Sequence, residues 1–186
     1  MVVTLIATTA FASDAPSASS SKPAGARAAA AAIKSIEGVY KTRFANSTVH
    51  EEHFVSEDIL EIVPYTADKI YFRLHLEFFN AHICDLFGIA RYEDGSFVFH
   101  GPPAVSEEPC ILKIRARKGS VTLDDVGSNC RGYSCGARGG YQGAGFPMTS
   151  RRAIRYMQLL TASREYAEAI TEFEDLAKSP PSGEKR

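Results

Sequence analysis

The strongest constraint on the fold is a strict alternation of apolar and polar side chains between residues 69 and 79. In the segment "KIYFRLHLEFF" the apolar residues share one face: Ile70, Phe72, Leu74, Leu76 and Phe78. Successive side chains of a strand point to opposite faces, so this pattern predicts an antiparallel strand with one buried and one solvated face. Other strand-like segments lie between Gly38 and about Asp125, separated by turn sequences such as "EDG" and "KG".

The periodicity changes after residue 148. In "TSRRAIRYMQLLTASREYAEAITEFEDLAK" one set of residues recurs at spacings of three and four: Tyr156, Leu159, Leu160, Ser163, Tyr166, Ala167, Ile170 and Phe173. This spacing predicts one amphipathic helix, with Thr149 or Ser150 as its N-cap. The expected fold class is therefore α+β, a curved antiparallel β-sheet or small barrel of six to eight strands followed by one long C-terminal helix.

The composition along the chain predicts a single domain with flexible ends. Residues 1–12 are uncharged and end in Ala-Phe-Ala, which is typical of a signal-peptide remnant and too short to span a bilayer as a helix. Residues 13–36 are expected to form a linker and a short Ala-rich helix. Residues 37–178 would form the globular domain, and residues 179–186 a flexible tail.

Charge and cysteine content narrow the class of protein. The net charge is −1, so no general attraction to nucleic acid or membranes is expected. Four cysteines, an even number, indicate export to an oxidising compartment, periplasmic or secreted. No cysteine precedes Cys84, so we expect no lipid anchor at the N-terminus. The sequence leaves monomer and dimer open.

The four cysteines are expected to form two disulfide bonds. Four cysteines allow three pairings. The favoured pairing is Cys84–Cys110, between strand-like segments, with Cys130–Cys135 as a local bridge. Zinc sites commonly use paired Cys-x2-4-Cys ligands, whereas here one Cys-x4-Cys stands with two distant cysteines. We therefore expect no metal and no other cofactor.

The segment "CRGYSCGARGGYQGAGF", residues 130–146, is too glycine-rich for a regular helix or strand. Between Val126 and Arg164 the chain has six arginines and no acidic residue. Guanidinium groups suit carboxylates and phosphates, and tyrosine gives large contact area at low entropic cost. This pattern predicts a partner-binding loop with these contact residues: Tyr133, Arg138, Tyr141, Gln142, Phe146, Arg151 and Arg152.

A second interpretation of this segment stays open. It could be a glycine-permitted crossover that packs the helix onto the sheet. The arginines would then solvate the surface or pair with Glu107, Glu108 and Asp124. The segment matches neither a phosphate-binding P-loop nor a dinucleotide fingerprint.

Patterns typical of catalysis are weak. "HEEHF", residues 50–54, lacks the His-Glu-x-x-His order of zinc proteases and is expected to be a solvated loop. Cys84 and His82 share a strand face, so a cysteine nucleophile with a histidine base is conceivable, but a disulfide is the expected role of Cys84. No Gly-x-Ser-x-Gly elbow occurs. We therefore expect a protein that is not an enzyme, with an enzyme using His82 or His50 and His53 as the last of three hypotheses.

Several segments carry a resemblance: "DILEIVPY", "YFRLHLEFFNAHIC", "LFGIARYEDG", the Cys-containing run ending in "SCGARGGYQGAGF", and "SRRAIRY". Over residues 37–170 the chain resembles a group of exported proteins of Gram-negative bacteria. Its C-terminal part is similar to that of lysozyme-inhibitor-like and periplasmic immunity proteins. The chain departs from the better-known inhibitors because it has no lipobox cysteine.

The resemblance implies a periplasmic protein that binds a peptidoglycan hydrolase or a toxin effector by inserting a loop into its cleft. On that view the inserted loop is residues 133–146, with Arg138 and Tyr141 as anchors. Many lysozymes are basic, so an arginine-rich loop would be repelled unless it reached the catalytic carboxylates. The alternative is a barrel that binds a small ligand in a cavity lined by Phe72, Leu74 and Leu86.

Overall fold

The computed structural model describes residues 21–103, 108–136 and 138–178. The predicted signal-peptide remnant, the first part of the linker and the C-terminal tail (179–186) lie outside the described residues. The strands are β1 (Gly38–Ser47), β2 (His53–Thr66), β3 (Lys69–Phe78), β4 (His82–Glu93), β5 (Ser96–Pro103), β6 (Pro109–Arg117), β7 (Ser120–Asp125) and β8 (Gly145–Pro147). The helices are α1 (Ser21–Ile36), α2 (Asn129–Ser134), α3 (Met157–Thr161) and α4 (Arg164–Lys178), with short 3-10 turns η1 (Phe79–Ala81), η2 (Val126–Ser128) and η3 (Met148–Ser150).

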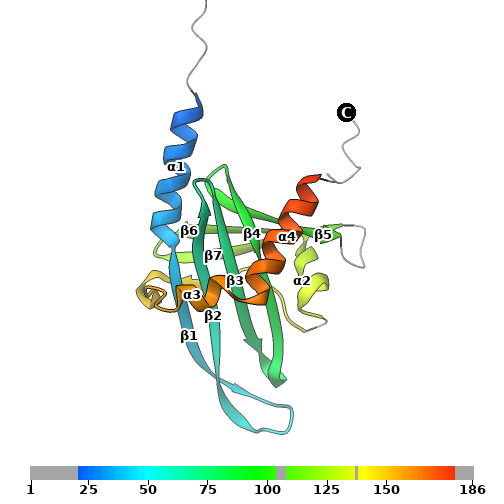
Figure 1. Cartoon of the computed structure of the whole chain (residues 1–186). Helices are drawn as coiled ribbons and strands as arrows, with labels where there is room; N and C mark the ends of the chain where they lie inside the picture. Colours follow the sequence, from blue (N-terminus) through cyan, green and yellow to red (C-terminus); the bar gives the residue numbers. More distant parts are fainter. Residues whose placement is uncertain (1–20, 104–107, 137, 179–186) are drawn as a thin grey trace, which may run out of the picture.

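The eight strands form one antiparallel sheet in sequence order, and this sheet curls into a nearly closed barrel (Figure 1). Val39 in β1 and Arg152 exchange two backbone hydrogen bonds, of 2.9 and 2.8 Å, so the chain after β8 meets the first strand. β4 and β5 pair only at residues 91–93 of β4 and then diverge. The predicted α+β class and strand number are confirmed, with a gap in the barrel wall beside β4.

The predicted alternation in β3 is confirmed and places the core. Phe72, Leu74 and Leu76 point into the barrel and are at most 2% exposed. Phe72 and Leu74 belong, with Leu86 of β4, to one buried cluster, and the rings of Phe72 and Phe99 pack edge to face with centroids 5.3 Å apart. The residues that the small-ligand hypothesis placed around a cavity therefore pack against one another.

The expected turns between strands are confirmed by their backbone angles. Asp94 and Gly95, between β4 and β5, both have positive φ, as do Lys118 and Gly119 between β6 and β7. Two successive positive φ values are what a two-residue hairpin with the right-handed strand twist requires. Asn80 also has a positive φ in the tight turn between β3 and β4.

The Ala-rich helix α1 is part of the packed structure. Ala29, Ile33 and Ile36 are spaced four and three residues apart and are buried, while the first turns project from the body (Figure 1). Ile33 and Ile36 join the barrel core. The core thus extends to residues before position 37, where we expected the globular domain to begin.

The prediction of one long helix starting at Thr149 or Ser150 is wrong in extent. The long helix is α4, which begins at Arg164, and the Oγ atom of Ser163 accepts a hydrogen bond from the backbone N–H of Tyr166 at 3.2 Å. Residues 148–152 instead form η3 and the bridge to β1, because their backbone groups pair with Gly119 and Val39. Tertiary pairing overrides the helical period in this stretch.

Helix α4 covers the outer face of the sheet (Figure 1). A second apolar cluster joins it to β2, β3 and β4 through these buried residues: Val63, Tyr71, Ile89, Leu160 and Ala169. The rings of Tyr71 and Tyr166 lie 4.8 Å apart in this layer. The strands beneath α4 are therefore buried on both faces, while their ends beyond the helix keep an uncovered outer face.

Candidate functional site

The disulfide bonds hold α2 in the gap of the barrel wall. Cys84 of β4 pairs with Cys135, and Cys110 of β6 pairs with Cys130. All four cysteines are oxidised as expected, but the predicted pairing of 84 with 110 and of 130 with 135 is wrong. The reason is topological, because β5 separates β4 from β6 in the sheet and the two ends of α2 each reach one of these strands.

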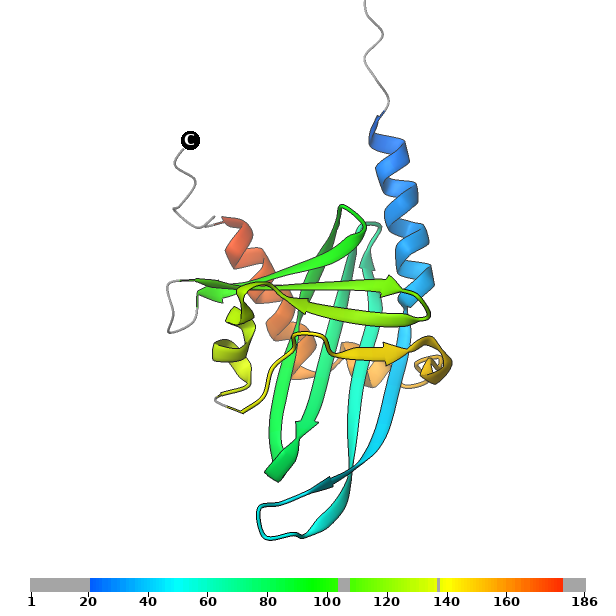
Figure 2. The same ribbon diagram turned by 180° about the vertical axis from the view of Figure 1, so that it is seen from behind.

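The glycine-rich segment packs closely against this staple. A side-chain carbon at Gly139 would collide with the Sγ atom of Cys84 and approach the ring of Phe78 to 3.2 Å. Only a residue without a side chain lets the backbone pass here. Figure 2 shows the segment running from α2 across the barrel to β8. The segment is therefore a crossover, as the second interpretation held, but the C-terminal helix packs on the sheet through other residues.

Two of the predicted contact residues lie in the core. Tyr141 is fully buried, and its hydroxyl lies 2.5 Å from the Oγ atom of Ser134. Phe146 in β8 is 1% exposed and packs edge to face on Tyr40. Burial raises the pKa of the Tyr141 hydroxyl. As anchors on an exposed loop these two residues are a wrong prediction, because their rings have no surface to offer a partner.

Other predicted contact residues make contacts within the chain. Tyr133 is half-buried, donates to Glu172 of α4 at 3.4 Å, and has a pKa raised to about 12 by burial and by that carboxylate. Gln142 is exposed, but its Oε1 atom accepts the backbone N–H of Asp125 at 2.9 Å. Arg138 is exposed and makes no hydrogen bond or ion pair with the described residues.

The two adjacent arginines stabilise the fold. Arg151 donates from both terminal nitrogens to the carbonyl oxygens of Ser35 and Lys34, at 3.0 and 3.1 Å. These are the last carbonyls of α1, where a positive charge also complements the helix dipole. Arg152 donates to the carbonyl oxygen of Thr149 at 2.9 Å. Their cationic groups are therefore already engaged at backbone oxygens.

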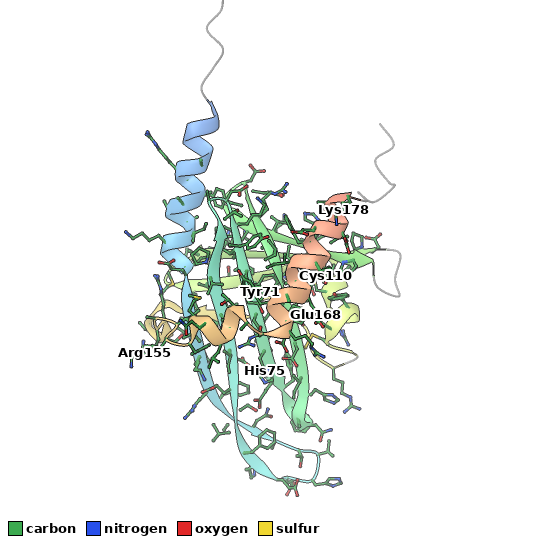
Figure 3. The ribbon with its side chains drawn as sticks, in the orientation of Figure 1. Tyr71, His75, Cys110, Arg155, Glu168 and Lys178 are labelled. Carbon is green, nitrogen blue, oxygen red and sulfur yellow. A yellow bond between two sulfur atoms is a disulfide. The ribbon has the colours of Figure 1, made fainter. Side chains whose placement is uncertain are left out.

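A pocket of about 650 Å³ lies on the outer face of β1–β4, beside the N-terminal end of α4. Figure 3 shows His75 on the part of β3 that the helix leaves uncovered. The lining combines charged side chains from four strands with apolar walls from Ile59 and Phe87, and Tyr156 closes one side. Pockets of this size with convergent polar groups are typical of small-molecule sites.

The base of this pocket is an ion pair between a buried carboxylate and a partly exposed guanidinium. Glu61 is 3% exposed, and its Oε2 atom accepts a hydrogen bond from Nε of Arg73 at 2.5 Å. The hydroxyl of Tyr156 donates to the other carboxylate oxygen. A buried carboxylate needs such partners to offset its lost hydration. The bonded Glu61 raises the pKa of Arg73, so the guanidinium stays charged.

A histidine between two carboxylates lies next to this pair. Nδ1 of His75 is 2.7 Å from Oδ1 of Asp85, and Nε2 is 3.4 Å from Oε1 of Glu77. Burial by itself lowers the pKa of His75, but the hydrogen bonds and negative charges of Asp85 and Glu77 outweigh it and raise the pKa above its ordinary value. The ring is therefore positioned to carry a proton near neutral pH.

The raised pKa of His75 predicts a pH-dependent stability. A histidine whose pKa is higher in the folded than in the unfolded state stabilises the protein at pH values below its unfolded-state pKa, about 6.5. This contribution disappears as pH rises through the higher folded pKa. At acidic pH the wild type should have a higher free energy of unfolding than His75→Gln, by less than about 1 kcal/mol because these ion pairs are partly exposed. This difference should vanish above neutrality. Urea titrations across this range measure it, and Asp85→Asn should reduce the same slope. An identical slope in His75→Gln and the wild type would contradict the assignment.

The tips of the β1–β2 and β3–β4 hairpins form an exposed apolar surface. We call residues 47–55 and 78–83 the hairpin tips. Large exposed apolar side chains gather there: Val49 at 55%, Val55 at 71%, Phe79 at 53% and Ile83 at 47% exposure. The two tips are joined, because Asn80 accepts the backbone N–H of Val49 at 3.3 Å. Figures 1 and 2 show the β1–β2 hairpin projecting beyond the barrel.

The catalytic alternatives gain no geometric support. Cys84 is disulfide-bonded, so it has no thiol to act as a nucleophile with His82. His50 and His53 lie in the β1–β2 tip, and no group of three or more His, Cys, Asp or Glu side chains able to hold a metal occurs among residues 21–103, 108–136 and 138–178. Within the same ranges, no helix is long and apolar enough to cross a membrane.

Comparison with known proteins found no match, neither to a protein-family model nor to a curated protein or a solved structure. The candidate sites are therefore assigned only from the arrangement of residues in the structure. Sequence reasoning missed the pocket, although its signal was present in the polar face of "YFRLHLE", which sets Arg73, His75 and Glu77 on one side of β3.

Proposed function

We propose that the chain is an exported binding protein that inhibits a basic peptidoglycan hydrolase, and that it contacts the enzyme with its hairpin tips. The observation that carries this proposal is the gathering of exposed apolar side chains on two linked, projecting turns. Large exposed apolar side chains that gather on one part of a protein mark an interaction site more often than singly scattered ones do. The two disulfides are compatible with an extracellular or periplasmic location.

The shape of the tips suits an enzyme cleft. The β1–β2 hairpin is convex and extends away from the barrel (Figure 1), as insertion into a concave site requires. Asn46 donates to the carbonyl oxygen of Phe78 at 3.0 Å, a second link between the two hairpins. Such links reduce the entropy lost on binding, because the tips are already held relative to each other.

Charge at the tips favours a basic partner. Glu51 and Glu52 are exposed at the turn of the β1–β2 hairpin and give this tip two carboxylates. Opposite charge speeds association and suppresses wrong partners. A basic hydrolase would repel the arginine-bearing segment 131–155 but would attract this tip. The charge distribution therefore favours the hairpins over the glycine-rich segment as the contact surface.

The proposal is tested by inhibition assays. The purified chain is added to a panel of basic lysozymes, amidases and endopeptidases acting on isolated peptidoglycan, and hydrolysis is followed over a range of inhibitor concentrations. We expect saturable inhibition of at least one enzyme, with an affinity that falls as ionic strength rises. Absence of inhibition across the panel would refute the proposal.

Truncation of the tips should weaken binding without weakening the fold. Because Phe79 and Ile83 are about half exposed, Phe79→Ala and Ile83→Ala should each lower the affinity by about 1 kcal/mol or more, as interface anchors do, with the melting temperature nearly unchanged. Calorimetric titration and thermal melting measure the two quantities. Leu159→Ala is the matched control, since Leu159 is 76% exposed on α3, away from the tips, and should bind normally. Equal losses in all three variants would contradict a role specific to the tips.

A further inference from the structure

We propose that the pocket between the outer sheet face and α4 binds a small zwitterion, a short peptide with a free ammonium and a free carboxylate group. The pocket shares no residue with the hairpin tips. This inference is therefore independent of hydrolase binding, and either proposal can fail without the other. Three features of the pocket support it: an oriented guanidinium, an open carboxylate at a neighbouring position of the next strand, and lining charges of both signs.

Arg73 supplies a receptor for a carboxylate. Its Nε atom is held by Glu61, which fixes the plane of the guanidinium, while its two terminal nitrogens make no hydrogen bond with the described residues. The side chain is 36% exposed in the pocket wall. A planar guanidinium with two free N–H donors binds a carboxylate through two parallel hydrogen bonds. Because Glu61 orients it beforehand, little entropy is lost on binding.

Asp85 supplies a receptor for an ammonium group. Its Oδ1 atom is occupied by His75, whereas Oδ2 has no partner among the described residues and the side chain is 65% exposed. In the β3–β4 ladder Arg73 lies opposite Phe87, and His75 lies opposite Asp85. Arg73 and Asp85 are thus diagonal neighbours, whose Cα atoms are about 7–8 Å apart. The charged ends of an extended dipeptide are about two residue lengths, ~7 Å, apart.

The charge of the pocket favours a ligand with both signs. Besides His75, three lining residues are cationic and three are anionic: Lys41, Arg73, Arg164, Glu61, Asp85 and Glu165. A protonated His75 adds one positive charge. A simple anion or cation meets repelling as well as attracting charges on such a wall, whereas a zwitterion can place each group at its opposite charge. Ile59 and Phe87 offer an apolar wall for a ligand side chain. The volume, about 650 Å³, lies in the range of small-ligand sites.

The test is a calorimetric titration of the full chain with alanyl-phenylalanine in its four stereoisomeric forms, and with the N-acetylated and C-amidated derivative of each. We expect at least one isomer to bind with a Kd of about 1 mM or lower. Removing either charge should weaken that isomer by about tenfold, as loss of a hydrogen bond to a charged group does. Absence of binding by every isomer, or equal binding of the free, acetylated and amidated forms, would overturn the proposal.

Two variants assign the ends of the ligand. Arg73→Lys keeps the charge beside Glu61 but removes the two-nitrogen fork, so it should weaken the preference for the acid over the amide. Asp85→Asn should lose the preference for the free over the acetylated amine. Because Asp85 is exposed, this variant should fold normally, so the site can still be tested if Arg73→Lys proves unstable. Glu174→Gln, which neutralises an exposed acid of α4 outside the lining, is the matched control and should bind as the wild type does. Full retention of both preferences in the two variants would contradict the site.

Discussion

Replacing Cys84 and Cys135 together by alanine is expected to lower the free energy of unfolding by about 4 kcal/mol. The two cysteines are 51 residues apart in the chain, and a cross-link over a loop of that size removes roughly this much conformational freedom from the unfolded chain. The Cys110–Cys130 bridge closes a 20-residue separation, so its removal should cost about 3 kcal/mol, the smaller of the two effects. Guanidinium chloride unfolding of both double variants gives the comparison.

The effect of the Cys84–Cys135 bridge should also be local. This bridge ties the end of α2 to β4 where β4 and β5 have diverged, so nothing in the sheet itself closes the gap there. Hydrogen exchange of residues 129–141 should therefore accelerate in Cys84→Ala/Cys135→Ala, while exchange in β2 and β3 stays slow. Peptide mapping that links Cys130 to Cys135 in the wild-type protein, or a stability loss below about 1 kcal/mol, would contradict this arrangement.

Tyr141→Ala is expected to lower the free energy of unfolding by about 3–5 kcal/mol, the range for truncating a large buried aromatic side chain. Tyr141 is fully buried, and its ring belongs to the barrel core together with Phe146 and Cys135. Tyr141→Phe keeps the ring and removes only the hydroxyl beside Ser134, so it should cost about 1 kcal/mol. Denaturant titrations of both variants separate the contribution of the ring from that of the hydroxyl.

Arg138→Ala is the control for the glycine-rich segment. Arg138 is exposed in the same segment and contacts no described residue through a hydrogen bond or ion pair, so its removal should change stability by less than about 0.5 kcal/mol. A stable Tyr141→Ala variant that lost affinity for the hydrolase would show that Tyr141 is a contact residue and would contradict its structural role.

The sequence predicts the fold best where apolar and polar side chains alternate with a clear period. The alternation in β3 fixes which side chains enter the core, and the turns at Asp94-Gly95 and Lys118-Gly119 each contain a glycine, which tolerates positive φ. These local signals agree with the final structure, so the α+β class and the meandering sheet could be inferred. The start of α4 could not, because the pairing of residues 148–152 with β1 and with Gly119 depends on partners far away in the chain.

The candidate sites were harder to predict because they depend on what covers a surface. The glycine-rich segment has no period, so nothing in it distinguished an exposed loop from a crossover, and the burial of Tyr141 follows from the gap beside β4. The pairing of the cysteines likewise follows from the strand order. The polar face of β3 predicted solvent exposure, but α4 and Tyr156 turn part of that face into a walled pocket in which Glu61 is buried.

The most direct test of the proposed function is hydrogen exchange of the chain alone and in complex with the hydrolase that it inhibits. The proposal predicts that binding slows exchange in the hairpin tips, residues 47–55 and 78–83, and leaves residues 130–146 unchanged. Slower exchange confined to residues 130–146, with the hairpin tips unaffected, would contradict it.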